Sequence, residues 1–319
     1  MANELKRSKR IIIGDEEIAK QVNPENMKYL QRYLRDMEMR ELSPKSIYSY
    51  KCDILAWFRY LVENQFNPVV TELTEDDIEE FIYFCKQEGN NTERIKRRLA
   101  SLSAFYKFLR KKKFIKENPM EFIARPKKGM PVVTQTFLTM DQYLLMKEKL
   151  HGQDDLQLLV YGMFSISTMA RVTAVSSIRW EQIDLQGRTV DDVLEKEGKI
   201  VTLYFSEEVR DLLGKLKQQR EERGIDSPYV FISKYKGEIN QISSNTLSEW
   251  AKKIGEMIGV PTLHPHDFRH SGSQLLSLSG MPIEKISELL NHSGLDVTKN
   301  HYLRQDKRKI QAEKDKYSF

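Results

Sequence analysis

The chain has 319 residues, enough for two domains of ordinary size, and its 30% charged and 40% hydrophobic residues allow a buried core beneath a solvated surface. No apolar run approaches the ~20 residues of a membrane helix, and the N-terminus lacks the long apolar stretch of a secretory signal. The two cysteines, Cys52 and Cys85, lie in helical apolar patterns without metal-ligand spacing nearby. We therefore expect a cytoplasmic protein in which both cysteines are core thiols.

Residues 24–116 predict a small all-helical domain, preceded by an N-terminal extension over residues 1–23. Asn23-Pro24 and Ser43-Pro44 each place an N-cap residue before a proline at the first helical position. Thr74 with Asp77 resembles a capping box for a third helix. A fourth helix turns its apolar positions inward, which completes a bundle of four amphipathic helices with short loops.

Positive charge is concentrated in the last of these helices. The formal net charge is only +5, but residues 92–116 contain ten Lys or Arg and a single acid, whereas residues 74–80 read TEDDIEE. A basic surface of this kind can follow a phosphate backbone. The candidate contact residues, left largely on the outer faces of the helix, are Arg94, Arg97, Arg98, Lys107, Arg110 and Lys111.

Residues 117–136 form the best candidate linker, because they contain three prolines and a glycine and show weak periodicity. Their basic residues, Arg125, Lys127 and Lys128, indicate that this connection also lies near an anion. Lys127 and Lys128 therefore join the candidate contact residues.

Residues 137–305 predict a second, larger domain of mixed structure, followed by a charged tail over residues 306–319. Two short strands surround the turn at Glu197-Gly198, and residues 229–233 are a further candidate strand. The remaining apolar patterns are helical. Their predicted helices follow Thr139, cover roughly 155–168, carry Val209 to Leu216, and span 245–258, 266–279 and 283–291. The predicted fold class is mainly α with a small antiparallel β-sheet.

The stretch HPHDFRH, residues 264–270, holds three of the six histidines of the chain beside one arginine. On a helix beginning near residue 266, His266 and Arg269 share one face at the N-terminus, where free N–H groups and the helix dipole favour anions. An arginine fork can grip two phosphate oxygens, and a histidine can exchange a proton near neutral pH. The basic neighbour and the lack of a third close ligand disfavour a metal, and His264 and His270 are expected to have structural or surface roles.

This stretch and the residues that follow it carry a family resemblance. They comprise His-x-x-Arg opening a helix, a glycine turn, Leu-Leu-x-His-Ser, and a tyrosine about ten residues later. Here these positions are His266, Arg269, Gly280, His292 and Tyr302. The pattern resembles the C-terminal signature of the tyrosine recombinase (phage integrase) family.

Upstream segments extend the resemblance to residues 24–305. Residues 167–184 are similar to the first arginine motif of the family, with Arg171 as the arginine. EKEGKIVTLYFS resembles the β-hairpin that delivers a catalytic lysine; Lys196 is the best match, and Lys199 on the same turn is the alternative. The helical domain and basic linker are similar to the SAM-like core-binding domain of the family, and the larger domain to its catalytic domain.

The resemblance implies a role for each of these residues. Tyr302 would attack the scissile phosphate to form a 3′-phosphotyrosine, while Arg171 and Arg269 hold its non-bridging oxygens. His292 would add a hydrogen bond to the phosphate. Lys196 would protonate the departing 5′ oxygen, and His266 would assist proton transfer at the tyrosine. The reaction needs no metal or other cofactor, since the bond energy is kept in the protein–DNA linkage.

The expected partners are double-stranded DNA and further copies of the chain, as a dimer or tetramer on DNA, in a bacterial or phage-encoded protein associated with the nucleoid and not with a membrane. The charged tail could pack on a neighbouring protomer.

The chain departs from the family pattern in three places. The first arginine motif commonly reads Gly-Leu-Arg-x-x-Glu, but here Met169 replaces the glycine and Ala174 replaces the acid. Loss of that carboxylate removes a group that could orient the cations of the site. Asn291 replaces a glycine in Leu-Leu-x-His-Ser, a milder change because Asn tolerates the left-handed conformation. These departures keep open a transcriptional regulator, such as a repressor, that binds DNA without cutting it, and other strand-transfer roles such as a relaxase.

Overall fold

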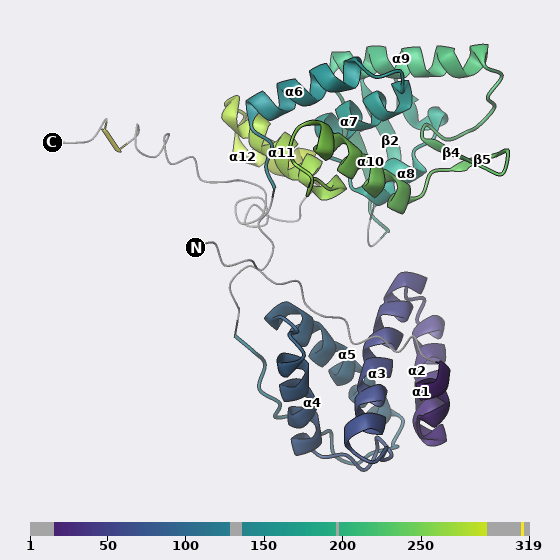
Figure 1. The fold of residues 1–319 in the computed structure, drawn as a ribbon, viewed down its shortest axis with the longest axis vertical. Helices are drawn as coiled ribbons and strands as arrows, with labels where there is room; N and C mark the ends of the chain where they lie inside the picture. The colour runs from purple at the N-terminus through teal and green to yellow at the C-terminus, as the bar shows by residue number, and fades with distance from the viewer. Residues whose placement is uncertain (1–15, 128–135, 196–197, 292–313, 316–319) are drawn as a thin grey trace. The chain divides into compact units, whose positions relative to one another are not determined.

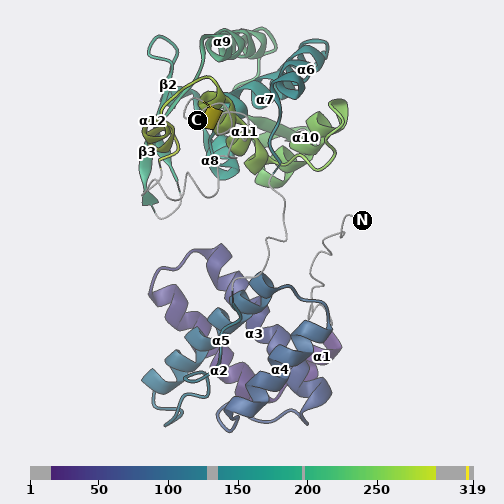
Figure 2. The same cartoon turned by 90° about the vertical axis from the view of Figure 1, so that its left-hand side faces the viewer.

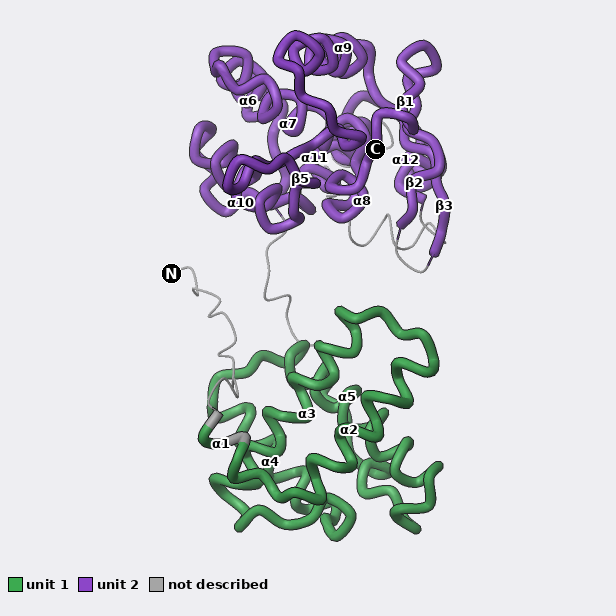
Figure 3. Tube along the Cα trace, turned by 90° about the vertical axis from the view of Figure 1, so that its right-hand side faces the viewer, with its two compact units in different colours: residues 1–134 green, residues 135–319 purple. Residues whose placement is uncertain are grey.

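The computed structural model describes residues 16–127, 136–195, 198–291 and 314–315. The chain divides into two compact units, residues 1–134 and 135–319 (Figure 3). The division falls inside the predicted linker. Among the described residues, no helix is long and apolar enough to cross a membrane.

Over residues 16–127, unit 1 is an all-helical bundle that contains the four predicted helices (Figure 1). Its helices are α1 (Glu16–Gln21), α2 (Pro24–Met39), α3 (Pro44–Asn64), α4 (Glu75–Gln87) and α5 (Thr92–Lys111). Local capping sets where they begin: the side chain of Asn23 accepts from the Glu25 amide and that of Ser43 from the Ser46 amide. The short helix α1 lies in the segment predicted as an extension.

The core of unit 1 is strongly aromatic. Trp57 and Phe58 of α3 are fully buried and pack near Tyr106 and Phe105 of α5, with ring centroids 5.5 and 6.3 Å apart. Part of the predicted linker also belongs to this core, because the Met120 side chain and that of Ile123 are buried against it. Of the two cysteines, Cys85 is buried as expected, whereas Cys52 is only partly so.

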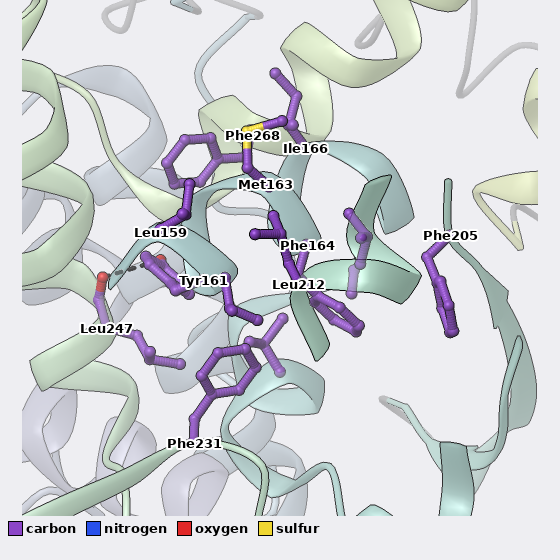
Figure 4. Close-up of a cluster of buried hydrophobic side chains, with 14 of the residues drawn as sticks. Leu159, Tyr161, Met163, Phe164, Ile166, Phe205, Leu212, Phe231, Leu247 and Phe268 are labelled. Atoms are coloured by element: carbon purple, nitrogen blue, oxygen red, sulfur yellow. Dashed lines mark hydrogen bonds between the residues drawn. The ribbon is translucent and has the colours of Figure 1, made fainter. Parts of the chain in front are cut away.

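Unit 2 is built around α7, whose sequence LQLLVYGMFSIST is almost wholly apolar. Its helices are α6 (Met140–His151), α7 (Leu156–Thr168), α8 (Val172–Ser177), α9 (Glu207–Glu222), α10 (Ser244–Met257), α11 (Pro265–Leu278) and α12 (Ile283–Leu289). Side chains from α9, α10 and α11 surround α7, among them Leu212, Leu247 and Phe268 (Figure 4). The Tyr161 hydroxyl donates to the Leu247 carbonyl at 2.9 Å, which satisfies the polar atom of this buried side chain.

Two small antiparallel sheets complete unit 2. Their strands are β1 (Ile183–Asp184), β2 (Thr189–Leu194) and β3 (Ile200–Tyr204) in one sheet, and β4 (Ile232–Tyr235) with β5 (Glu238–Gln241) in the other. The β2–β3 hairpin lies beside α12 (Figure 2). The predicted fold class is confirmed, although the strand expected at 229–233 begins only at Ile232.

Candidate functional site

Arg171 follows a sharp reversal of the chain at the end of α7. Met169 caps that helix in the left-handed conformation, with φ at 54°, and Arg171 becomes the N-cap of α8. The Met169 side chain is buried against Ile286 and Leu290. The Met169 side chain has room because the facing residue of α11 is Gly272, which has no Cβ. A Cβ at position 272 would lie only 2.7 Å from Met169 Cγ. The position where the family uses glycine is therefore a packing contact in this chain.

Arg269 joins this reversal to the end of α12. Its guanidinium is almost fully buried, and it donates from Nη1 to the Met169 carbonyl at 2.7 Å and from Nη2 to the Leu290 carbonyl. Asn291, the next residue, is left-handed with φ at 54°, as expected for its place in the motif. The structure thus brings Arg269 to the chain segment that carries Arg171, although 98 positions separate them in sequence.

His266 lies in the first turn of α11 and is exposed to solvent. His264 caps the helix by accepting from the His266 amide through Nδ1, and the Asp267 carboxylate accepts from the His264 amide at 2.9 Å. Desolvation of the ring, helped by the positive charge of Arg269 and then by His264 and Arg171, lowers the pKa of His266 from 6.5 to about 4. The imidazole is therefore neutral at physiological pH and can accept a proton. His270 is buried, with its ring 4.5 Å from that of His266, which agrees with a structural role.

A residue that sequence reasoning missed completes this cluster. The Glu195 carboxylate at the end of β2 pairs with the Arg171 guanidinium, and the Glu195 side chain is 1% exposed against 33% for Arg171. The signal in the sequence was only its position beside the candidate lysine.

Three of the predicted site residues, Lys196, His292 and Tyr302, lie outside the described residues, as does Lys128. Their described neighbours are nevertheless connected. Lys199, on the far side of the hairpin turn, donates from Nζ to the Asn291 carbonyl at 3.0 Å. This bond ties the hairpin to the loop that follows α12. It also occupies the amine that was the alternative candidate for the proton donor.

The groups gathered at the site suit an anion. The Arg171 guanidinium is one-third exposed and lies near the His266 imidazole, and its fork matches the geometry of phosphate oxygens. Both Nη atoms of Arg269 donate to backbone carbonyls, so this buried guanidinium adds positive charge behind the other two groups. Within the described ranges, no group of three or more His, Cys, Asp or Glu side chains is arranged to hold a metal ion.

The basic candidates of unit 1 are either exposed, partly buried or ion-paired, or, in one case, buried. Lys107, Arg110, Lys111 and Lys127 are exposed. The first three, with Arg125, line a single hollow of about 570 Å³ between α5 and residues 118–125. Arg94 is partly buried, and Arg97 is held by Asp53, whose side chain is 1% exposed, with Nη2 and Oδ1 2.6 Å apart.

The prediction for Arg98 is wrong. Its side chain is buried, with Nη1 2.9 Å from the Cys85 sulfur and the guanidinium 6.0 Å from the centre of the Phe81 ring. Position 98 falls on the same face of α5 as Ile95 and Leu102, which pack inward. A guanidinium in this environment cannot reach a DNA phosphate.

Comparison with protein families agrees with the geometry of the site. The phage integrase family matches residues 136–309, and the N-terminal SAM-like domain of phage integrases matches residues 30–113. The chain belongs to the phage integrase (tyrosine recombinase) family. The first of these matches contains the site, and the second contains the basic helix α5.

Curated relatives of this family member include two tyrosine recombinases named XerC. The protein from Lactobacillus delbrueckii subsp. bulgaricus is 25% identical over 268 residues, which cover 81% of this chain and 88% of the relative. That from Leptospira interrogans is 26% identical over 275 residues, covering 85% and 86%.

Solved structures share the fold. The Tn1549 transposon integrase in complex with transposon right end DNA has a TM-score of 0.69 at 15% identity, covering 91% of this chain and 99% of that one. A lambda integrase dimer bound to a COC′ core site has a TM-score of 0.65 at 17% identity, covering 84% and 95%.

Proposed function

We propose that the protein is a site-specific recombinase that cuts and rejoins DNA strands through a 3′-phosphotyrosine. The observation that carries the proposal is the meeting of Arg171, Arg269 and His266, which come from the start of α8 and from α11. Two guanidinium groups beside a neutral imidazole can neutralise a phosphorane while a proton leaves the attacking group. The chain also belongs to a family whose named relatives are tyrosine recombinases.

In the proposed reaction, the Tyr302 oxygen attacks the scissile phosphorus and the bond to the 5′ oxygen breaks. His266 accepts the tyrosine proton, and Lys196 supplies a proton to the departing 5′ oxygen, which leaves as a hydroxyl. Arg171, Arg269 and His292 stabilise the charge on the non-bridging oxygens. Attack by another 5′ hydroxyl reverses these steps and rejoins the strand, so no external energy source is needed.

Unit 1 would supply most of the sequence-independent affinity for double-stranded DNA. We assign that role to its exposed basic residues, Lys107, Arg110, Lys111 and Lys127, together with Arg94 and Arg97. Lambda integrase has been solved as a dimer on a core site and as a tetramer on a Holliday junction. We extend self-association on DNA to this chain, and with it a location at the bacterial nucleoid in the cytoplasm.

A covalent trapping experiment tests the proposal without knowledge of the target site. The protein is incubated with a library of nicked duplexes of random sequence, in which cleavage releases a short strand and prevents rejoining. We expect a denaturation-resistant adduct from the wild type, and DNA binding without an adduct from Tyr302→Phe. If both proteins bind DNA and neither forms an adduct, the recombinase assignment is lost and the regulator replaces it.

A further inference from the structure

We infer that Glu195 is the positioning carboxylate of this site, holding the Arg171 guanidinium in the role that the family assigns to the acid missing at Ala174. The inference rests on the proposed function and adds a residue to it. Glu195 acts through Arg171 and does not itself touch the DNA.

The burial of the pair is unequal, and this favours a positioning role. Glu195 accepts from Arg171 Nη1 with its side chain 1% exposed, whereas a third of the Arg171 side chain reaches solvent. The second carboxylate oxygen, Oε1, is buried without a hydrogen-bond partner in the described part of the chain. A buried carboxylate needs a compensating cation, so Glu195 holds the Arg171 guanidinium on its buried side. The solvent-exposed part of Arg171 stays open to a ligand.

A β-bulge turns Glu195 inward. Val190 pairs with Leu203, but Val193 pairs with Val201, so β2 carries one residue more than β3 between these positions. Strict alternation from Val190 would point Glu195 to solvent. The bulge absorbs the extra residue, and buried side chains resume at Val193 and Glu195.

The bulge is held by specific hydrogen bonds. The Gln182 side chain donates from Nε2 to the carbonyls of Asp191 and Asp192, at 3.1 and 2.9 Å. Beyond it, the Glu195 amide donates to the Lys199 carbonyl at 2.8 Å and closes the hairpin turn. The inward direction of Glu195 is thus built into the strand.

Helix α8 provides no acid of its own for Arg171. Its first turn lacks acidic residues, and Ala174 is buried among the apolar side chains of unit 2. The carboxylate reaches Arg171 from the hairpin instead. In the sequence, Glu195 directly precedes Lys196, the proposed proton donor.

The central test compares Glu195→Gln with Glu238→Gln, which removes the same charge from an exposed strand position. We expect Glu195→Gln to slow single-turnover adduct formation by about 10- to 100-fold. Its affinity for intact DNA should stay within about 2-fold of wild type, as should both properties of the control. A merely structural role would lower affinity and thermal stability together with the rate, and that result would overturn the inference.

A double-variant cycle asks whether Glu195 acts through Arg171. In an Arg171→Lys background, which keeps the charge but loses the fork, Glu195→Gln should change the rate by less than about 2-fold. If the two rate losses multiply instead, Glu195 acts by another route and the inference fails.

A third measurement does not depend on activity. Phenylglyoxal modifies guanidinium groups, and the modified peptides can be followed by mass spectrometry in the DNA-free protein. We expect Arg171 to react several-fold faster in Glu195→Gln than in wild type or Glu238→Gln. Equal rates would overturn the inference, even if the wild type formed no adduct and the recombinase assignment had failed.

Discussion

The left-handed Met169 allows a stability test with an unusual expected order. Its φ of 54° costs a non-glycine residue about 1–2 kcal/mol. Its buried side chain, packed on Ile286 and Leu290, offsets that cost. Met169→Ala loses the packing, worth about 2–5 kcal/mol for a buried methionine, and keeps the backbone cost. Met169→Gly loses the same packing but removes the backbone cost. Glycine also increases the conformational entropy of the unfolded chain, which offsets part of this gain. We therefore expect the Met169→Gly variant to be about 1 kcal/mol more stable than the Met169→Ala variant.

Urea unfolding of the full chain, followed by tryptophan fluorescence and fitted with one transition for each unit, measures this difference. Trp57 lies in unit 1, whereas Trp180 and Trp250 lie in unit 2. Only the transition of unit 2 should move, and alanine should be the least stable of the three residues at this position. An alanine variant as stable as the glycine variant would refute the argument, because alanine is preferred wherever φ is negative.

Further predictions concern DNA binding, the hairpin and pH. The double variant Lys107→Ala/Lys111→Ala should bind DNA more weakly, and the magnitude of the slope of log association constant against log salt should fall by about 2. Arg98→Met changes a buried residue and should leave that slope unchanged. Filter binding from low to high salt measures both slopes. Lys199→Met should slow adduct formation without abolishing it, because its amine holds a backbone carbonyl; complete loss in the trapping assay would make it the proton donor instead. The pKa of His266 is about 4 in the folded protein against an ordinary 6.5, so the unfolded chain binds more protons between these values. The free energy of unfolding should therefore fall as pH drops from 6.5 to 4, and His266→Gln should flatten that fall in urea melts; an unchanged curve would contradict the shift.

The helices could be predicted from sequence because their signals are local. Asn23, Ser43 and Thr139 each cap the helix that follows, and each cap acts within three residues. The order of Arg171, His266 and Arg269 along the chain predicts that they belong to one site. The structure supports their proximity through the bonds of Arg269 to the ends of α7 and α12.

Arg98 and Glu195 could not be predicted, for related reasons. Both are charged residues whose direction depends on another segment. Arg98 is turned inward by the packing of α5 on α4, where Cys85 and Phe81 surround its guanidinium. Glu195 is turned inward by the β-bulge, in which β2 has two residues between Val190 and Val193 where β3 has one between Val201 and Leu203. Side-chain type alone favours exposure in both cases.

The same bulge makes the hairpin tolerant of a change in length. Asp192 is the extra residue of the bulge, because the Asp191 carboxylate accepts from the Thr202 hydroxyl of β3 and Asp192 has a left-handed φ of 54°. The Asp192 side chain is exposed. Deleting it would give a regular strand pair in which Val193 and Glu195 keep their partners and their direction. The position that faces Arg171 therefore depends on its distance in sequence from the hairpin turn and not on its distance from the start of β2.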